Sequence, residues 1–579
     1  MLKHYSEFLK KNIWRYVVGV IILLLVDLFQ LVLPQVLSRF TDSLLAGSTV
    51  MSDIHRIVII IGILAVGIAV SRFLWRVMIT WTAVYFEAWI RSKLFKHLTG
   101  LPRTFYHEHK TGDLMAHATN DIRTVRFASS GGIIMSVDAL FISITTIILM
   151  FITIDWKLTL IALAPMPLIA VVVFYMGRII HRKFGLVQEG FSILSDKAQE
   201  SFAGIRVIKS FSQEDNDLQD FNEKNQLNYE RNMSLARTNS LMRPLVRFIG
   251  SISGILGIMF GTRFVLNGDI SVGEFVAFIT YLDMFVWPMM AFGFFTNLIQ
   301  RGAASIRRLN KLFDQTSDLH DVEDSDDLTD RSIRGRDLTF HYPGTAQPAL
   351  ADFSLDVPSG SSLGIIGRTA SGKSTLTSLL LRLYNIPDKT VFVGGQDINA
   401  ISVADTREMI GAVVQDHFLF STKIKKNIAF TGDEIDEERM VESAKTAQIH
   451  DEIADLPLGY DTYLGERGVN LSGGQKQRTS IARLLYKSPD IMILDDALSA
   501  VDTKTEDAIL RHIEEELSGR TTIVISHRVS TLRKMDQIIF MDQGRILERG
   551  SHEELMDLKG HYYQVFLKQQ LEEKIQEVA

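Results

Sequence analysis

Two stretches of this sequence combine residue types and spacing that suit nucleotide chemistry. The first follows the pattern Gly-x-x-x-x-Gly-Lys-Ser over residues 367–374. Successive backbone N–H groups of such a loop cradle phosphates, while Lys373 would reach the β- and γ-phosphates and the Ser374 hydroxyl would bind Mg²⁺. The residues that we expect to bind nucleotide in this loop are Gly367, Arg368, Thr369, Ala370, Ser371, Gly372, Lys373, Ser374 and Thr375.

The second stretch ends in two adjacent carboxylates, Asp495 and Asp496, directly after the apolar run at residues 491–494. A buried strand that delivers a carboxylate at its end supplies an oxygen ligand for Mg²⁺ on a nucleotide phosphate, so we expect Asp495 to bind the metal. Many ATP-hydrolysing enzymes carry a glutamate at the next position to orient water, and Asp496 is one methylene shorter. The sequence therefore predicts good ATP binding and slow hydrolysis by this chain alone.

The elements around these residues are predicted to be those of an α/β fold. Residues 363–366 read as a short buried strand before the loop, and an apolar pattern of helical period follows it. A strand before and a helix after are the context that distinguishes a P-loop from a chance match. Ala370 stands where glycine is frequent, which predicts a slightly stiffer loop.

The first part of the chain, to about residue 300, is of a different kind and holds six apolar segments, each long enough to cross about 30 Å of hydrocarbon. They lie near residues 16–37, 57–79, 132–153, 158–177, 245–266 and 274–298. The chain has no cysteine, which excludes disulfides and thiolate zinc sites, and its net charge of −6 gives no electrostatic case for nucleic-acid binding. A multi-pass membrane protein is predicted, and a soluble ATPase acting on DNA is excluded.

Loop lengths and charges predict the orientation of this membrane part. The connections between segments 3 and 4 and between 5 and 6 are short, whereas those between 2 and 3 and between 4 and 5 are long and basic. The positive-inside rule then places both long connections and both termini in the cytoplasm. Helical periodicity in the long connections predicts that the membrane helices continue into the cytoplasm and turn near residues 103–112 and 204–211.

Ionisable residues also lie within the apolar segments. We expect Arg72 and Arg76 to extend their side chains to the inner membrane interface. Asp27, Asp138 and Asp283 either face a cavity or take part in structural ion pairs. No segment is polar enough to indicate a specific substrate.

The pentapeptide Leu-Ser-Gly-Gly-Gln occupies residues 471–475, before a helix-like stretch at 476–486 and the acidic strand end. Alone, it is compatible with a simple loop and helix N-cap. Between a P-loop and an acidic strand end it resembles the signature motif of the ATP-binding cassette (ABC) proteins. Together with the six apolar segments, the resemblance is to an ABC exporter half-transporter of the type IV exporter fold, and it covers nearly the whole chain.

The resemblance implies a fold and an organisation. The fold would be an α-helical membrane domain, with six transmembrane helices extended into the cytoplasm, plus an α/β P-loop ATP-binding cassette domain. The membrane domain would cover residues 1–314, an acidic linker 315–331 and the nucleotide-binding domain 332–579. The two turning segments would be coupling helices that rest on nucleotide-binding domains.

The resemblance also implies roles for single residues, with ATP and Mg²⁺ as cofactors. Tyr342 would stack on adenine, Gln415 would contact Mg²⁺ beside Ser374 and Asp495, and His527 would contact the γ-phosphate. Catalysis would then involve Asp496, His527 and Gln415. The signature residues expected to bind ATP are Ser472, Gly473, Gly474 and Gln475. Residues 465–468 resemble the exporter X-loop and residues 499–502 the D-loop.

Asp496 is the departure from the family that matters, because the family normally has a catalytic glutamate there. Aspartate withdraws the carboxylate by roughly 1 Å, and a misplacement on that scale can cost about 10²-fold in rate. A conservative replacement with near-normal turnover is the alternative. The pattern is similar to the LmrC/BmrC/EfrC-type subunits of heterodimeric Gram-positive multidrug exporters, whose ATP sites lie between the P-loop of one chain and the signature of the other. The resemblance therefore implies a second, unlike ABC half-transporter as the partner.

The expected function is ATP-driven export of amphipathic, drug-like small molecules by a multi-pass protein of the plasma membrane in contact with membrane lipid. A lipid or lipopeptide flippase would use the same machinery. A homodimeric exporter would instead carry two aspartate sites. A ligand-gated channel, or a regulatory subunit without transport turnover, belongs to a different class, and we see no ring of charge that favours it.

Overall fold

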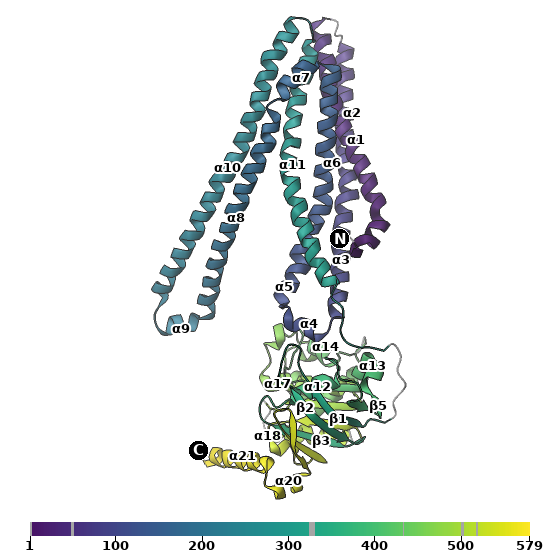
Figure 1. The fold of residues 1–579 in the computed structure, drawn as a ribbon, viewed down its shortest axis with the longest axis vertical. Coiled ribbons are helices and arrows are strands. Elements are labelled where there is room, and N and C mark those ends of the chain that lie inside the picture. The colour runs from purple at the N-terminus through teal and green to yellow at the C-terminus, as the bar shows by residue number, and fades with distance from the viewer. Residues whose placement is uncertain are drawn as a thin grey trace. The chain divides into compact units, whose positions relative to one another are not determined.

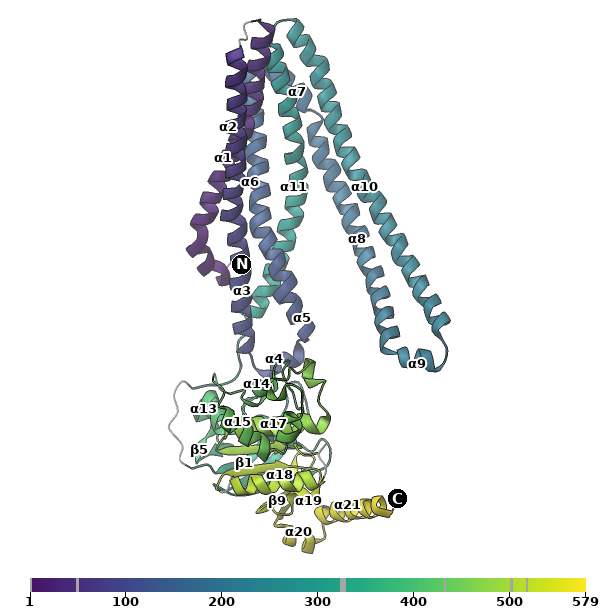
Figure 2. The same cartoon turned by 180° about the vertical axis from the view of Figure 1, so that it is seen from behind.

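The computed structural model describes residues 3–47, 51–322, 330–431, 434–499, 503–516 and 519–578. The chain forms two compact units, shown from opposite sides in Figures 1 and 2. The first contains Met1–Gly100 and Lys110–Thr316, and the second contains Leu101–His109 and Ser317–Ala579. Part of the predicted linker (323–329) and most of the predicted D-loop (500–502) lie outside the described residues.

Apart from short connections, the described residues of the first unit are helical, and it holds six helices long and apolar enough to cross a membrane, which confirms the six predicted segments. Its elements are η1 (Lys3–Tyr5), α1 (Ser6–Leu45), α2 (Met51–Arg76), η2 (Val77–Trp81), α3 (Thr82–Thr99), α5 (Thr111–Ala116), η3 (His117–Asp121), α6 (Ile122–Thr153), α7 (Trp156–Leu163), α8 (Met166–Ala203), α9 (Ile205–Ser210), α10 (Glu214–Leu266) and α11 (Val272–Phe313). The segments η2 and η3 are π-helical turns within longer helices.

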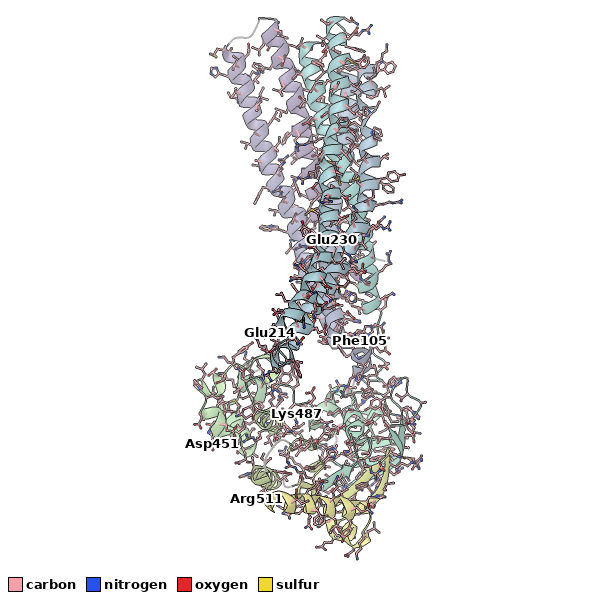
Figure 3. All side chains as sticks on the ribbon, turned by 90° about the vertical axis from the view of Figure 1, so that its left-hand side faces the viewer. Phe105, Glu214, Glu230, Asp451, Lys487 and Arg511 are labelled. Carbon is pink, nitrogen blue, oxygen red and sulfur yellow. The ribbon has the colours of Figure 1, made fainter. Side chains whose placement is uncertain are left out.

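The long helices confirm the predicted extensions beyond the membrane. The 53 residues of α10 span about 80 Å at 1.5 Å per residue, far more than a hydrocarbon core requires. The short helix α9 joins α8 to α10 at the predicted second turning point (Figure 1). Lys197 on α8 forms ion pairs with Asp217 (2.7 Å) and Asp220 (2.8 Å) on α10, which hold these two helices together. Glu214 and Glu230 mark the course of α10 in Figure 3.

The carboxylates predicted inside the apolar segments have different surroundings. Asp27 is fully buried, whereas Asp283 is exposed. Asp138 on α6 accepts a hydrogen bond from Trp287 Nε1 on α11 (3.2 Å), which gives it a neutral polar partner across two helices. Arg72 and Arg76 are exposed on α2.

The second unit is built on two sheets. The larger has the strand order β10-β9-β3-β8-β7-β6, and its strands are parallel except for β10. Its bounds are β3 (Ser362–Gly367), β6 (Ile410–Val413), β7 (Ile491–Asp495), β8 (Thr521–Ile525), β9 (Gln537–Asp542) and β10 (Arg545–Gly550). The smaller, antiparallel sheet has the order β2-β1-β4-β5, from β1 (Ile333–Phe340), β2 (Leu350–Val357), β4 (Val391–Val393) and β5 (Gln396–Asp397).

Helices cover this α/β unit. They are α4 (Arg103–Glu108), α12 (Lys373–Leu380), α13 (Val403–Met409), α14 (Ile424–Ile428), α15 (Glu437–Thr446), α16 (His450–Ala454), α17 (Gly473–Lys487), α18 (Thr503–Glu516), α19 (Val529–Leu532), α20 (His552–Leu558) and α21 (His561–Val578), with short 3₁₀ turns η4 (Ile398–Ala400), η5 (Gly459–Asp461) and η6 (Glu466–Gly468). The helix α4 forms the predicted first turning segment and packs with this unit.

The core explains the unbroken apolar run before the acidic pair. In β7, Met492 and Leu494 join one hydrophobic cluster, whereas Ile491 and Ile493 join another. Side chains alternate between the two faces of a strand, so β7 is covered on both sides, as parallel strands in α/β folds are. The carboxyl end of the fully buried strand β7, with its acidic pair, therefore lies at the carboxyl-terminal end of the parallel sheet.

Candidate nucleotide-binding site

The P-loop connects β3 to α12, as the sequence predicts. Gly372, directly before α12, has φ 96°, and a Cβ there would lie 2.5 Å from the carbonyl oxygen of Ala349. Only glycine avoids both the backbone penalty and this clash. Ala370 also has a positive φ (63°), although it carries a side chain.

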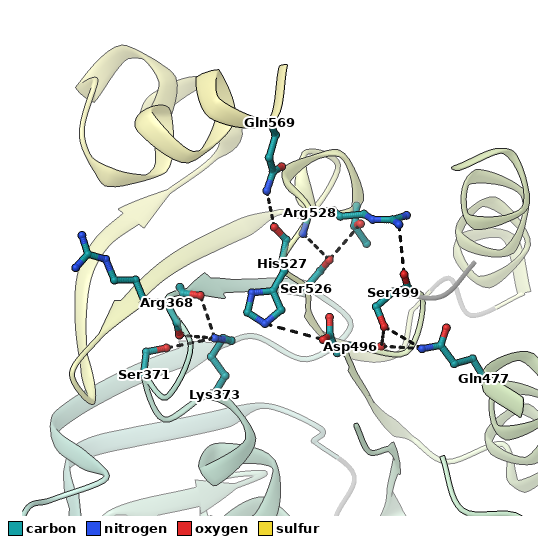
Figure 4. Close-up of polar contacts among 12 residues, drawn as sticks. Arg368, Ser371, Lys373, Gln477, Asp496, Ser499, Ser526, His527, Arg528 and Gln569 are labelled. Carbon is teal, nitrogen blue, oxygen red and sulfur yellow. Dashed lines mark hydrogen bonds and ion pairs between the residues drawn. The ribbon is translucent and has the colours of Figure 1, made fainter. Parts of the chain in front are cut away.

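Lys373 lies over this loop. Its Nζ donates hydrogen bonds to the carbonyl oxygens of Gly367 (3.0 Å) and Arg368 (2.8 Å), and it lies 3.4 Å from Ser371 Oγ (Figure 4). Burial lowers the pKa of Lys373, and the charges of Asp495 and Asp496 oppose that shift. The ammonium group is thus held at the loop, where phosphate oxygens would be stronger acceptors than neutral carbonyls.

The two carboxylates at the end of β7 have unlike surroundings. Asp495 is 3 % exposed, and burial together with the charge of Asp496 raises its pKa, whereas a hydrogen bond from Ser374 and the charge of Lys373 lower it. Asp496 leaves the strand with φ 54°, a conformation that aspartate tolerates better than most residues. Its Oδ2 lies 4.0 Å from His527 Nε2, which is too long for a hydrogen bond.

Tyr342 is held from several sides at the edge of the site. Its hydroxyl donates to Thr375 Oγ1 (3.0 Å). The rings of Phe340 and Tyr384 meet it edge-on, each with a centroid distance of 5.2 Å. The folded chain therefore holds the ring in one orientation by its own contacts.

A cavity of about 760 Å³ brings most of the predicted site residues together. The predicted residues in its lining are Tyr342, Thr369, Ala370, Ser371, Gly372, Lys373, Ser374, Thr375, Gln415, Asp495, Asp496 and His527. Gly367 and Arg368 do not line it and contribute through the carbonyls that Lys373 binds. A cavity of this size lies within the range of small-molecule sites.

The signature residues Ser472, Gly473, Gly474 and Gln475 do not line this cavity. They begin α17, where Ser472 and Gln475 form a reciprocal capping box: Gln475 N–H donates to Ser472 Oγ (3.3 Å), and Ser472 N–H donates to Gln475 Oε1 (2.8 Å). Within the described chain the motif is thus an exposed helix start, whose positive dipole end suits an anion.

Residues that the sequence did not indicate also contribute to the site. Gln347, Gly544 and Arg545 line the cavity, and Gly544 N–H donates to the carbonyl of Ser371 (3.1 Å). Gln569, far along the chain, bonds to the segment that carries His527. These residues belong to no recognisable motif, since their roles depend on strands and helices that meet only in the folded unit.

The side chains fit a nucleotide with a divalent metal. Ser374, Gln415 and Asp495 offer a hydroxyl, an amide and a carboxylate, which are the oxygen ligands that Mg²⁺ takes together with substrate phosphates. Phosphate oxygens would complete this set of ligands, because a single buried carboxylate binds Mg²⁺ only weakly.

Comparison with known proteins agrees with this geometry. A family model for the ABC transporter transmembrane region matches residues 16–289, and a second model, described as ABC transporter, matches residues 350–499. The chain is 36 % identical to the probable multidrug resistance ABC transporter ATP-binding/permease protein YheI of Bacillus subtilis, over 99 % of this chain and 98 % of that protein. It is 32 % identical to an ATP-dependent lipid A-core flippase of Syntrophus aciditrophicus, over 84 % and 81 % of the two chains. A bacterial Atm1-family ABC exporter, solved with ATP bound, superposes with a TM-score of 0.80 at 25 % identity over 97 % of this chain and 98 % of that chain.

These matches cover both units and nearly the full length of the chain. They agree with a multi-pass membrane protein whose C-terminal ABC domain is cytoplasmic and whose ATPase activity is coupled to export. The chain therefore belongs to the ABC transporter family, as an exporter half-transporter with its own transmembrane region and ATP-binding cassette.

Proposed function

We propose that this chain is one half of a heterodimeric exporter of amphipathic, drug-like compounds and that it supplies an ATP site that hydrolyses slowly. The observation that carries the proposal is Asp496, whose carboxylate ends 4.0 Å from His527 Nε2. One more methylene would extend it by roughly 1 Å, enough to bring the two groups within hydrogen-bonding distance. With the shorter aspartate side chain, the carboxylate of residue 496 and the His527 imidazole do not form the hydrogen bond that a glutamate could make.

A second chain is part of the proposal because the site is incomplete in one chain. The P-loop cavity lacks this chain's own signature residues, and Ser472 and Gly473 are exposed. In the arrangement proposed here, the partner's signature would close this cavity, and the motif at 471–475 would close the partner's. The intact signature then serves the faster site, which lies on the partner's P-loop.

Each predicted site residue has a proposed role. Tyr342 would stack on adenine, and the residues of the P-loop from Gly367 to Thr375 would hold the phosphates. Ser374, Gln415 and Asp495 would hold Mg²⁺, which supplies charge neutralisation on the phosphates. His527 would contact the γ-phosphate, and Asp496 would orient water poorly.

The proposed organisation couples this site to the membrane part. The membrane domain would cover 1–314, the linker 315–331 and the nucleotide-binding domain 332–579. ATP binding would drive transport only if ATP stabilises the closed pair of domains more than the open pair, because equal affinity for both states shifts nothing. Slow hydrolysis at this chain's site would keep one nucleotide bound while the other site turns over.

Asp496→Glu in the full-length transporter tests the slow site. We expect the hydrolysis rate at this chain's site to rise roughly ten- to a hundredfold, because the longer side chain restores the reach of the carboxylate. The matched control is Asp495→Glu, which lengthens the neighbouring buried carboxylate and should lower the rate. An unchanged rate in Asp496→Glu would show that side-chain length is not what limits the site.

A purification experiment separates the heterodimer from a homodimer. The chain purified alone in lipid vesicles should hydrolyse ATP slowly. Co-expression with a second half-transporter that carries Glu at the position equivalent to Asp496 should give a 1:1 complex of much higher activity. Robust, drug-stimulated hydrolysis by the chain alone would favour the homodimer instead.

A lipid substrate is the second candidate, favoured by the similarity to a lipid A-core flippase. Transport of a fluorescent lipid and of a cationic dye, measured in the same vesicles, distinguishes the two. We expect ATP-dependent dye transport to exceed lipid transport; the reverse result would assign the chain to lipid flipping.

A further inference from the structure

His527 lies in a short segment, and its imidazole side chain does little to hold that segment in place. The segment links β8 to α19 across residues 526–528. The imidazole side chain of His527 is 48 % exposed, and its Nε2 lies 4.0 Å from Asp496. The position of the ring therefore depends on how firmly the backbone on either side of His527 is fixed.

Gln569 on α21 fixes the backbone directly after the histidine at two points. Its Nε2 donates to the carbonyl oxygen of His527 (2.6 Å; Figure 4). Its Oε1 accepts from the backbone N–H of Val529 (2.9 Å). Among uncharged side chains, a carboxamide can donate and accept with two adjacent atoms in this way. Both bonds require the same orientation of the amide, so the two partners fix it.

The opposite side of the segment is held by other groups. Arg528 Nη1 donates to Glu506 Oε2 on α18 (2.5 Å), and Arg528 Nη2 donates to the carbonyl of Ser499 (3.3 Å). The Arg528 N–H also donates to Ser526 Oγ (3.0 Å). The segment thus lies between α18 and α21, and Gln569 supplies the contact from α21.

Among the described side chains of α21, those that dock the helix lie at or before Gln569. Glu548 accepts hydrogen bonds from the N–H groups of His561 and Tyr562 at the start of the helix, and the Tyr562 ring is fully buried. Beyond Gln569, the described side chains Leu571 and Ile575 are 61 % and 67 % exposed. Among these described side chains, the docked part of α21 thus extends to the residue that bonds to the histidine segment.

We propose that Gln569 is a positioning residue for His527, through which the C-terminal helix α21 controls the chemistry at the ATP site. This inference rests on the proposed contact between His527 and the γ-phosphate. Gln569 is not among the residues that line the cavity and acts through the backbone of residues 527–529. Displacement of α21 would release the carbonyl of His527 and let the ring leave its place.

Gln569→Ala and Gln569→Glu in the full-length transporter test the proposal. Glutamate keeps the size of the side chain and the acceptor for Val529 but places an oxygen against the carbonyl of His527. Both variants should therefore lose the hydrogen bond to that carbonyl. We expect kcat for ATP hydrolysis at this site to fall about tenfold or more, as for a catalytic group displaced by a fraction of an ångström. KM for ATP should change less than about twofold, because the P-loop and Tyr342 are untouched.

The neighbouring residue supplies the matched control. Gln570 is the same residue type on the same helix, is exposed, and has no contact with residues 527–529 among the described interactions. Gln570→Ala should therefore retain the kcat and KM of the unmodified transporter. If Gln569→Glu also retains that kcat, the amide acts only in packing and the proposal is wrong.

A double-mutant cycle with His527→Ala distinguishes positioning from a general effect on the fold. If Gln569 acts through His527, Gln569→Ala should cause no further loss of kcat in the His527→Ala background. A multiplicative loss would overturn the proposal. If His527→Ala alone leaves kcat unchanged, the proposed role of His527 fails, and the inference fails with it; a normal Gln569→Ala beside an impaired His527→Ala contradicts the inference alone.

Discussion

Ala370 adopts a left-handed backbone conformation in the P-loop (φ 63°), at a position where the sequence predicted a stiffer loop. A residue with a Cβ pays roughly 1–2 kcal/mol for that conformation, partly offset because glycine loses about 0.5–1 kcal/mol more chain entropy on folding. Ala370 therefore stores a small strain in the loop proposed to hold the phosphates, so the loop is less stable but more rigid than with glycine.

Ala370→Gly should relieve that strain. We expect the second unit to gain up to about 1 kcal/mol in stability, which raises its unfolding midpoint by about 2–4 °C in calorimetry of the full-length protein. The control is Gly372→Ala in the same loop, which meets both a positive φ and the carbonyl of Ala349. That variant should lose stability and ATP binding; equal midpoints for the two variants would contradict the assignment of strain.

Single residues with local chemistry were the easiest to predict. The P-loop, the acidic strand end and the signature are each formed by consecutive residues, so the local sequence is enough to predict the geometry of each. The strands and the helix predicted around them are confirmed by β3, β7 and α17. Gln569 lies 42 residues from His527, and a glutamine in an amphipathic helix has no feature that announces a hydrogen bond to a distant backbone. Such a contact depends on packing that no local pattern records.

At the scale of elements, contacts between helices that lie far apart in the sequence were equally hard to predict from local patterns. Asp121, at the end of the π-helical turn η3, accepts hydrogen bonds from Ser305 Oγ (2.8 Å) and Arg308 Nε (3.0 Å) on α11. The sequence placed Asp121 in the first cytoplasmic loop but gave no sign of this link to α11. π-Helical turns often occur at functional positions, and this one aims a carboxylate at the last membrane helix.

The short helix α4 shows how an element can connect to the ATP site. His107 lies 3.3 Å from the hydroxyl of Tyr384, and the Tyr384 ring packs edge-on against Tyr342. Phe105, 7 % exposed, anchors the same helix and stacks on His109. Burial raises the pKa of Tyr384, so its hydroxyl stays protonated at neutral pH. One buried ring therefore touches both α4 and the residue proposed to bind adenine.

Tyr384→Phe should weaken this connection without removing the ring. Loss of one hydrogen bond costs about 0.5–1.5 kcal/mol, so stimulation of ATP hydrolysis by a transported drug should fall roughly two- to tenfold. Binding of a fluorescent ATP analogue should stay within about twofold, because Tyr342 and the P-loop are intact. The control His107→Ala should reproduce the loss of stimulation; weaker ATP binding in Tyr384→Phe would show that the hydroxyl acts on the nucleotide pocket instead.

At the scale of the whole molecule, each chain carries apolar surface that its own described residues leave open. On and after the short helix α9, Val207 is 61 % exposed and Phe211 is 71 % exposed. In the second unit, a cavity of about 340 Å³ beside Gln415 is lined by residues such as Val414, Phe418 and Arg483. In the proposed pair of chains, α9 would be a coupling helix, and its exposed apolar end would dock on this largely apolar cavity of the partner's ATP-binding unit.

Val207→Ser and Phe211→Ser should therefore uncouple transport from ATP binding in the assembled transporter. Burying a phenylalanine or valine contributes about 1.5–3 kcal/mol, so docking of α9 on the partner would weaken roughly ten- to a hundredfold. Dye export from vesicles should fall accordingly, while ATP binding to the P-loop stays unchanged. Leu218→Ser is the matched control, because Leu218 is 56 % exposed on the adjoining arm of α10 and lies outside α9. Export that survives both α9 variants would mean that this apolar end faces solvent in the working dimer, whereas export lost equally in Leu218→Ser would point to the stability of the whole arm.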